Sequence, residues 1–231
     1  MLKSLRYCLI ISFFCFTNKL LSQELESLKA GVAGLNDQRK ADLYLKIAVL
    51  YSEKYGQPDS VFVYAQKTEN LSRKLNYANG ILNGIMYQGI AFQQKNNFDS
   101  AIAIFNGTLA HKENGSVKAY LHYYLGQTYD RAGDRKKSLE NLIEAVRLFK
   151  IKQDQEGLIL AYSRLADVFE NDSQHEEAKN YKNKAVQLLP EIKTPYVKLI
   201  TLSILSSIYF DLREISSANL DTSIVFAQEA F

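Results

Sequence analysis

The stretch Tyr120–Ala145, YLHYYLGQTYDRAGDRKKSLENLIEA, decides the fold of this chain. Leu121, Leu125 and Tyr129 recur at helical spacing, Gly133 interrupts the period, and apolar residues then resume it. This pattern predicts two amphipathic helices joined by a tight turn. Such a pair cannot bury its apolar face alone, so it needs neighbours of the same shape.

The chain supplies those neighbours, because one spacing occurs five times. In the quoted stretch, the small residue Gly126 is followed by an aromatic residue three positions later and by the small residue Ser138 twelve positions later. The equivalent triplets are Ala48, Tyr51 and Ser60; Gly89, Phe92 and Ala101; Ala166, Phe169 and Ala178; and Ser206, Tyr209 and Ala218. The leading small residues are separated by steps of 41, 37, 40 and 40 residues. Helices that cross closely need small side chains at the crossing, so the spacing predicts a series of helical hairpins.

This series resembles the tetratricopeptide repeat (TPR), with units of about 40 residues where about 34 is usual. The resemblance implies an all-α, right-handed superhelical solenoid of antiparallel helix pairs, with about five repeats and an N-terminal leading helix. The expected units span residues 41–80, 81–116, 117–156, 157–194 and 195–231. The longer unit is similar to the exported N-terminal sensor region of bacterial two-component histidine kinases.

The first segment, residues 1–22, is expected to be an export signal. Lys3 and Arg6 precede an apolar run over residues 7–16, and the stretch that follows is more polar. The run is short for a membrane span, which favours a signal peptide over a transmembrane helix. The sequence therefore predicts a mature solenoid over residues 23–231, exported to the periplasm or cell envelope, with an uncleaved N-terminal anchor as the alternative.

Loss of that segment would leave a chain with balanced charge and no cysteine. The whole chain has 28 Lys and Arg against 25 Asp and Glu, and the segment holds Lys3, Arg6 and Lys19 without an acidic residue, so 25 of each sign remain. A nucleic-acid-binding role would need a clustered basic excess. Both cysteines, Cys8 and Cys15, lie in the segment, which excludes disulfides and thiolate sites from the mature chain.

The start of the solenoid and its turns carry further helix signals. Apolar residues within 24–36 share one helical face and predict a leading helix that covers the open end of the first repeat. Asp59 and Asp99 stand where the second helices of the first two units should begin, so they are expected to be N-caps.

The other end of the sequence keeps the helical period up to Phe231. An apolar solenoid end without a polar capping helix needs a cover. We therefore expect a dimer through this end, a partner on it, or a chain that is a fragment of a membrane signalling protein.

Motifs of catalysis are absent from the sequence. It contains no GxxxxGK[ST], GxSxG or HExxH motif and no dinucleotide fingerprint. His122 stands where the repeat places a large residue, and His175 precedes two acidic residues at a predicted helix start. Both histidines are expected to be structural. We therefore expect no enzymatic activity, no cofactor and no metal site.

A binding surface is what the resemblance implies instead. In TPR proteins the first helix of each unit lines the concave side of the solenoid, where extended peptides bind. The residues expected on this face as partner-binding residues are Met86, Tyr120, Tyr123, Gln127, Asp130, Ser163 and Asp167. Tyrosine and methionine suit recognition because they are large and either amphipathic or adaptable. The alternative is that some of these side chains pack against the next helix.

The expected function is therefore that of a non-catalytic protein- or peptide-binding module in the periplasm, serving as the sensor or interaction region of a membrane signalling protein. A free-standing periplasmic scaffold for envelope assembly or export is the alternative. No nucleic-acid partner is expected, and contact with a membrane would come only through an uncleaved signal or a further C-terminal segment.

Overall fold

The computed structural model describes residues 23–110 and 117–211, and every regular element in these ranges is helical. A first helix spans residues 23–31. The others are α2 (Gln38–Leu50), a π-helix (Tyr51–Tyr55), α3 (Pro58–Lys74), α4 (Ala78–Gln94), α5 (Phe98–Leu109), α6 (Lys118–Arg131), α7 (Arg135–Lys152), α8 (Gln155–Asn171), α9 (His175–Leu188), a 3-10 turn (Leu189–Glu191) and α10 (Pro195–Asp211). The all-α prediction is confirmed for the described ranges.

Two of the sequence predictions fall outside these ranges. The expected signal segment, residues 1–22, and the second helix of the fifth repeat are not among the described residues. In the part of the chain that the structure covers, no helix is both long enough and apolar enough to cross a membrane.

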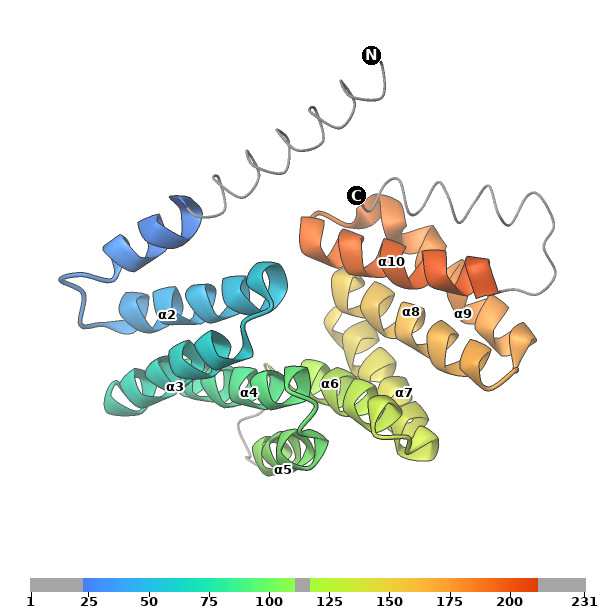
Figure 1. The fold of residues 1–231 in the computed structure, drawn as a ribbon, viewed down its shortest axis with the longest axis horizontal. Coiled ribbons are helices and arrows are strands. Elements are labelled where there is room, and N and C mark those ends of the chain that lie inside the picture. Colours follow the sequence, from blue (N-terminus) through green and yellow to red (C-terminus); the bar gives the residue numbers. More distant parts are fainter. Residues whose placement is uncertain (1–22, 111–116, 212–231) are drawn as a thin grey trace, which may run out of the picture. The chain divides into compact units, whose positions relative to one another are not determined.

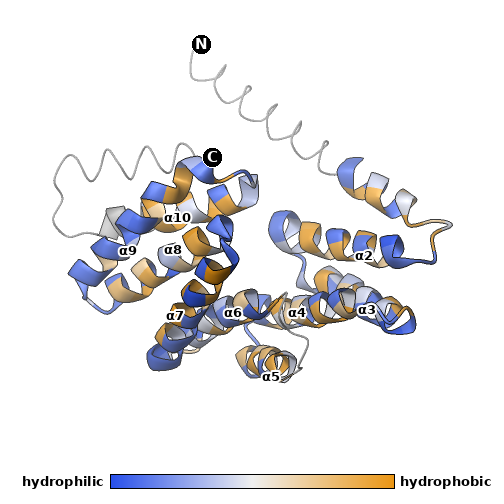
Figure 2. Cartoon of the chain, turned by 180° about the vertical axis from the view of Figure 1, so that it is seen from behind, coloured by the Kyte–Doolittle hydropathy of each residue, from blue (hydrophilic) through white to orange (hydrophobic). Residues whose placement is uncertain are grey.

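The chain divides into two compact units, residues 1–94 and 95–231. The first contains the helix at 23–31 and α2–α4, and the second contains α5–α10 (Figure 1). Within the second unit, α6 and α7 form one antiparallel hairpin, α8 and α9 form the next, and α10 packs against α8. Apolar and hydrophilic residues alternate around the helices, as amphipathic elements require (Figure 2).

The core of the first unit joins the leading helix to the first repeat. Leu25 is only 7% exposed and packs with Ile47, Tyr51 and Val61. The leading helix ends at residue 31 and is therefore shorter than the stretch 24–36 that the sequence indicated. Its apolar face covers the first repeat, as expected.

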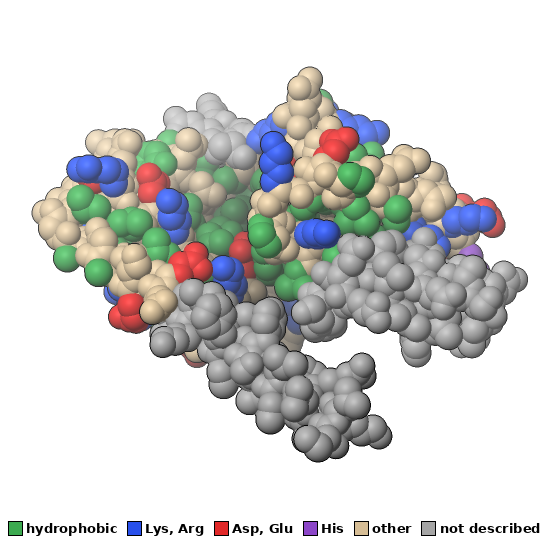
Figure 3. Space-filling view, turned by 90° about the horizontal axis from the view of Figure 1, so that it is seen from above, with side chains coloured by type: hydrophobic (Ala, Val, Ile, Leu, Met, Phe, Trp, Pro, Cys, Tyr) green, Lys and Arg blue, Asp and Glu red, His purple; other side chains and the backbone are tan. Residues whose placement is uncertain are grey.

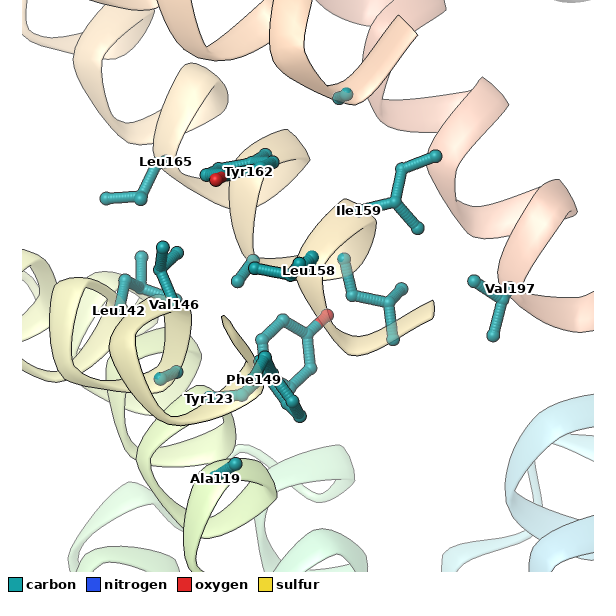
Figure 4. Packing of buried hydrophobic residues seen from close by; sticks show 14 of the residues in the cluster. Ala119, Tyr123, Leu142, Val146, Phe149, Leu158, Ile159, Tyr162, Leu165 and Val197 are labelled. Atoms are coloured by element: carbon teal, nitrogen blue, oxygen red, sulfur yellow. The ribbon is translucent and has the colours of Figure 1, made fainter. Parts of the chain in front are cut away.

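The core of the second unit is built by side chains from α6, α7, α8, α9 and α10 (Figure 4). Phe149 of α7 is fully buried in it, and Gly157 of α8 lies so close to the Phe149 ring that a Cβ there would overlap the ring. Leu165 on α8 and Val197 on α10 extend the same core. One continuous apolar cluster therefore ties successive hairpins together, as the repeat architecture requires.

Gly126 lies where α6 crosses α7. A Cβ on this glycine would lie 2.6 Å from Leu142 Cγ and 3.1 Å from the carbonyl oxygen of Ser138. Ser138 is itself fully buried. The two small residues that the sequence spacing paired thus meet at the helix crossing.

The turns that precede α3, α5, α7 and α9 share one backbone feature. In each, a residue with positive φ stands directly before the residue that precedes the new helix. The pairs are Gly56 and Gln57, Asn96 and Asn97, Gly133 and Asp134, and Ser173 and Gln174. A single left-handed residue reverses the chain in each turn.

The expected N-caps at Asp59 and Asp99 are wrong by two residues. Pro58 already begins α3, because a proline at the first helical position loses no hydrogen bond that a helix would make. In the next case, Asn97 is the N-cap and accepts a hydrogen bond from the Ser100 amide at 3.2 Å. Asp59 and Asp99 lie in the first turns instead, where a negative charge suits the helix dipole.

The connection from α9 to α10 is held to the start of α8 by Glu156. Its carboxylate accepts hydrogen bonds from the amides of Lys193 and Thr194 at 3.1 and 2.9 Å and from the Thr194 hydroxyl at 2.6 Å. Burial acts to raise the pKa of Glu156, but these hydrogen bonds outweigh burial and hold that pKa below its ordinary value.

Candidate functional site

Five polar side chains from α6 and α8 come together in the second unit. Tyr123, Gln127 and Asp130 share one face of α6, because they stand four and three residues apart, and Arg164 and Asp167 share one face of α8. Arg164 Nη1 donates to Asp167 Oδ2 at 3.0 Å, and Gln127 Nε2 donates to the Tyr123 hydroxyl at 3.5 Å. We call this group the α6–α8 polar cluster.

Arg164 lies at the centre of the cluster. Its side chain is 19% exposed, and that of Asp167 is 24% exposed. Burial acts to lower the pKa of Arg164, but Tyr123, Asp167 and Asp130 act in the opposite direction, and the net pKa is raised. The Nε atom of Arg164 is buried and has no hydrogen-bond partner among the described residues. The guanidinium therefore stays charged while one of its donors is unused.

Asp130 shares this cation with Asp167. Burial first, and then the charge of Asp167, raise the pKa of Asp130, whereas Arg164 and Arg135 act to lower it. The pKa lies above its ordinary value, so the folded environment disfavours the charged carboxylate. With both aspartates ionised, two negative charges stand against the one positive charge of Arg164.

The two tyrosines expected in the groove have structural contacts. The Tyr120 hydroxyl donates to Asp154 Oδ2 at 3.0 Å, and its ring meets Phe149 edge-on with centroids 4.9 Å apart. Burial, and then the charge of Asp154, raise the pKa of Tyr120. Tyr123 is only 3% exposed, and burial raises the pKa of its hydroxyl as well.

The remaining expected binding residues differ in accessibility. Met86, in the first unit, is 5% exposed and Ser163 is fully buried, so neither offers surface to a ligand in this structure. Gln127, Asp130 and Asp167 are half-buried and accessible. A partner-binding role for these three stays a prediction.

Arg164 is the residue of the cluster that sequence reasoning missed. The repeat register directs attention to Ser163 and Asp167, which it places on the inner face of α8. The signal was nevertheless present, because Arg164 is the only basic residue of α8 and stands three positions before an acid.

The two histidines among the described residues, His122 and His175, bond to neighbours across helices or turns. His122 Nδ1 lies 2.9 Å from Asn141 Oδ1 of α7, and His175 Nδ1 lies 2.8 Å from Glu170 Oε1 of α8. Within residues 23–110 and 117–211, no group of three or more His, Cys, Asp or Glu side chains is placed to hold a metal ion.

Charge is mixed on the face shown in Figure 3. Lysine and arginine side chains alternate there with aspartate and glutamate, without a large area of one sign. Among the described residues on this face, no basic stripe of the kind that nucleic-acid binding would use is visible.

The antiparallel helical hairpins, stacked in succession within the second unit, make this chain a TPR-like helical repeat protein. No model of a known protein family matches it. The regulatory protein RapG of Bacillus subtilis (strain 168) is 28% identical over 112 residues, which are 47% of this chain and 31% of RapG. The match therefore spans about a third of that relative.

Solved structures with the same architecture cover nearly the whole chain. BtubC (BKLC) from P. vanneervenii has a TM-score of 0.65 at 11% identity, covering 91% of this chain and 89% of its own. The apo form of RapI has a TM-score of 0.58 at 17% identity, and the match covers 94% of this chain and 70% of RapI. A signal transduction ATPase with a tetratricopeptide repeat sensor from Pyrococcus horikoshii has a TM-score of 0.59 at 16% identity. That match covers 95% of this chain and 34% of the ATPase.

At this sequence distance the likeness shows the fold alone. The TPR-like fold expected from the repeat spacing is confirmed by it. The same matches give no support to the resemblance to histidine kinase sensors.

Proposed function

We propose that this chain is a non-catalytic regulatory module that binds a protein or peptide, holding an extended segment of its partner against the α6–α8 polar cluster. The observation that carries the proposal is the cluster itself. Gln127, Asp130 and Asp167 come from the first helices of two successive repeats and remain accessible next to each other. The similarity to RapG, which is named a regulatory protein, supports a regulatory role.

The chemistry of these side chains suits a peptide in extended conformation. The backbone of such a peptide carries free N–H and C=O groups that need partners when they leave water. The carboxamide of Gln127 can donate to a carbonyl and accept from an amide at the same time, and the two carboxylates can accept from amides or cations. Side chains on two successive first helices would thus contact the segment along its length.

A bulky residue at Gln127 tests the proposal. Peptides selected from a phage-displayed random library on the wild-type protein are expected to bind Gln127→Trp at least about tenfold more weakly, since an indole would fill the accessible side of the cluster. The matched control is Glu140→Trp, on the exposed face of α7, which should bind as the wild type does. Affinities are measured by fluorescence anisotropy, and thermal melting confirms that both variants fold.

Selected peptides that bind Gln127→Trp and the wild type equally would overturn the proposed site. A milder variant, Gln127→Ala, removes the donor and the acceptor without adding bulk. It should weaken binding by a smaller factor than Gln127→Trp does.

Export of the module, as the sensor region of a membrane signalling protein, is the second part of the proposal. It rests on the basic start and apolar run within residues 1–22. When the full-length chain is expressed in a Gram-negative host, the protein in the osmotic-shock fraction should lack these residues by intact mass. Full-length protein confined to the cytosolic fraction would contradict export.

A further inference from the structure

The α6–α8 polar cluster contains two carboxylates, Asp130 and Asp167, and one cation, Arg164. Arg164 is the cation of the cluster and donates to Asp167 at 3.0 Å. Partial burial raises the pKa of Asp130, and the nearby charge of Asp167 raises it further. A second cation next to Asp130 would compensate for that loss of water and for the repulsion.

The two arginines nearest in sequence to Asp130 bond to other residues, although Arg135 also acts to lower the pKa of Asp130. Arg131, the next residue of α6, donates to Asn96 Oδ1 at 2.6 Å and lies over the Phe98 ring, 5.4 Å from its centroid. Arg135 of α7 pairs with Asp172 at 2.9 Å. Both arginines are held by partners in the turns before α5 and α9.

The acidic character continues along the same helix. Glu170 stands one turn after Asp167 on α8, its side chain is 9% exposed, and it is paired with His175 of α9 at 2.8 Å. His175 is 61% exposed at its side chain and is bound to Glu170.

We propose that the α6–α8 polar cluster recognises a basic side chain, Lys or Arg, of the bound segment, with Asp130 and Asp167 as its acceptors. This inference rests on the function proposed above and adds the chemistry of the partner. An ammonium or guanidinium group can hydrogen-bond to two carboxylates at once, and such charge-assisted bonds are stronger than neutral ones. Gln127, one turn before Asp130, is then placed to pair with the main chain beside that basic residue.

The test compares three random heptapeptide libraries that differ at one fixed central residue, which is Lys, Met or Glu. On the wild-type protein, the Lys library is expected to bind at least about tenfold more strongly than the Met library, and the Glu library more weakly than either. The advantage of Lys over Met should shrink as the salt concentration rises.

Asp130→Asn is the variant that identifies the acceptor. It keeps the shape of the side chain and removes a charge that the folded protein disfavours, so it should fold as the wild type does. We expect it to lose most of the advantage of Lys over Met. Glu140→Gln removes one negative charge from the exposed face of α7 and should keep the advantage.

The outcomes separate the inference from the proposed function. If the Lys and Met libraries bind equally and Gln127→Trp blocks both, the segment binds at this face without a basic anchor, and the inference is overturned while the function stands. If no library shows binding that Gln127→Trp reduces, the proposed function fails and the inference fails with it. An advantage of Lys that survives Asp130→Asn would also overturn the inference.

Discussion

Replacing Gly126 by leucine is expected to destabilise the second unit by about 3 kcal/mol or more. The first atom of the new side chain would already lie 2.6 Å from Leu142 Cγ and 3.1 Å from the Ser138 carbonyl oxygen. The second contact is with backbone, which cannot turn aside as a flexible side chain can, so α6 and α7 would have to move apart. Urea unfolding followed by circular dichroism measures the loss, and Gly126→Ala should lie between the wild type and Gly126→Leu.

Gly107 provides the matched control. It also lies within a helix, α5, but it is exposed, and a Cβ there would meet nothing within 4 Å. Gly107→Leu should be neutral or stabilising by up to about 1 kcal/mol, because leucine is the better helix former. Unchanged melting and helicity in Gly126→Leu would show that the repeat register assigned to this crossing is incorrect.

The second large effect is expected from Arg164→Met. Methionine keeps much of the length of the side chain but removes the cation that pairs with Asp167 and lowers the pKa of Asp130. Removing one partner of a buried ion pair typically costs about 3–5 kcal/mol, and the lower end applies here because Asp167 is 24% exposed. Arg147→Met is the control, because its pair with Glu144 lies on the surface and should contribute less than about 1 kcal/mol.

The loss in Arg164→Met should depend on pH. Arg164 is one of the groups that lower the pKa of Asp130, so its removal raises that pKa further above the unfolded value. The folded variant then binds a proton more tightly than the unfolded chain, and its stability falls as the pH rises above the ordinary range of an aspartate. The difference from the wild type should therefore be larger at pH 7 than at pH 4.5. A difference that is the same at both values would contradict the charge argument.

The fold could be predicted from the sequence because the repeat spacing encodes packing. A small residue followed by a second one twelve positions later places both at a helix crossing, and the structure brings Gly126 and Ser138 together there. The apolar face within residues 24–36 also predicted the leading helix. Leu25, on that face, is buried against the first repeat.

Helix starts were predicted less well, for a local reason. Several polar residues stand side by side at each turn, and any of them could cap the next helix. The N-cap is the residue that directly follows the left-handed turn residue. Asn97, for example, follows Asn96, whose φ is positive, and caps α5. The sequence pattern does not show that backbone angle for a non-glycine residue.

The candidate site was predicted in part. The repeat register gave the inner face of α6 and α8 and thereby Gln127, Asp130 and Asp167, but not the depth to which each side chain is buried. Tyr123 and Ser163 lie on the same face and are inaccessible, because burial depends on side chains from the next repeat. The pairing of Arg164 with Asp167 follows from their three-residue spacing, but the burial of Arg164 depends on the neighbouring helices.

The shared turn before α3, α5, α7 and α9 has a consequence for how such a chain can evolve. Since one left-handed residue, followed by the residue that precedes the next helix, closes each of these turns, every hairpin joins its two helices through the same connection. Duplication or deletion of one whole repeat would preserve that connection, whereas gain or loss of one residue within a turn would rotate the next helix by about 100° and expose its apolar face. Whole hairpins are thus the natural units of inheritance for this architecture.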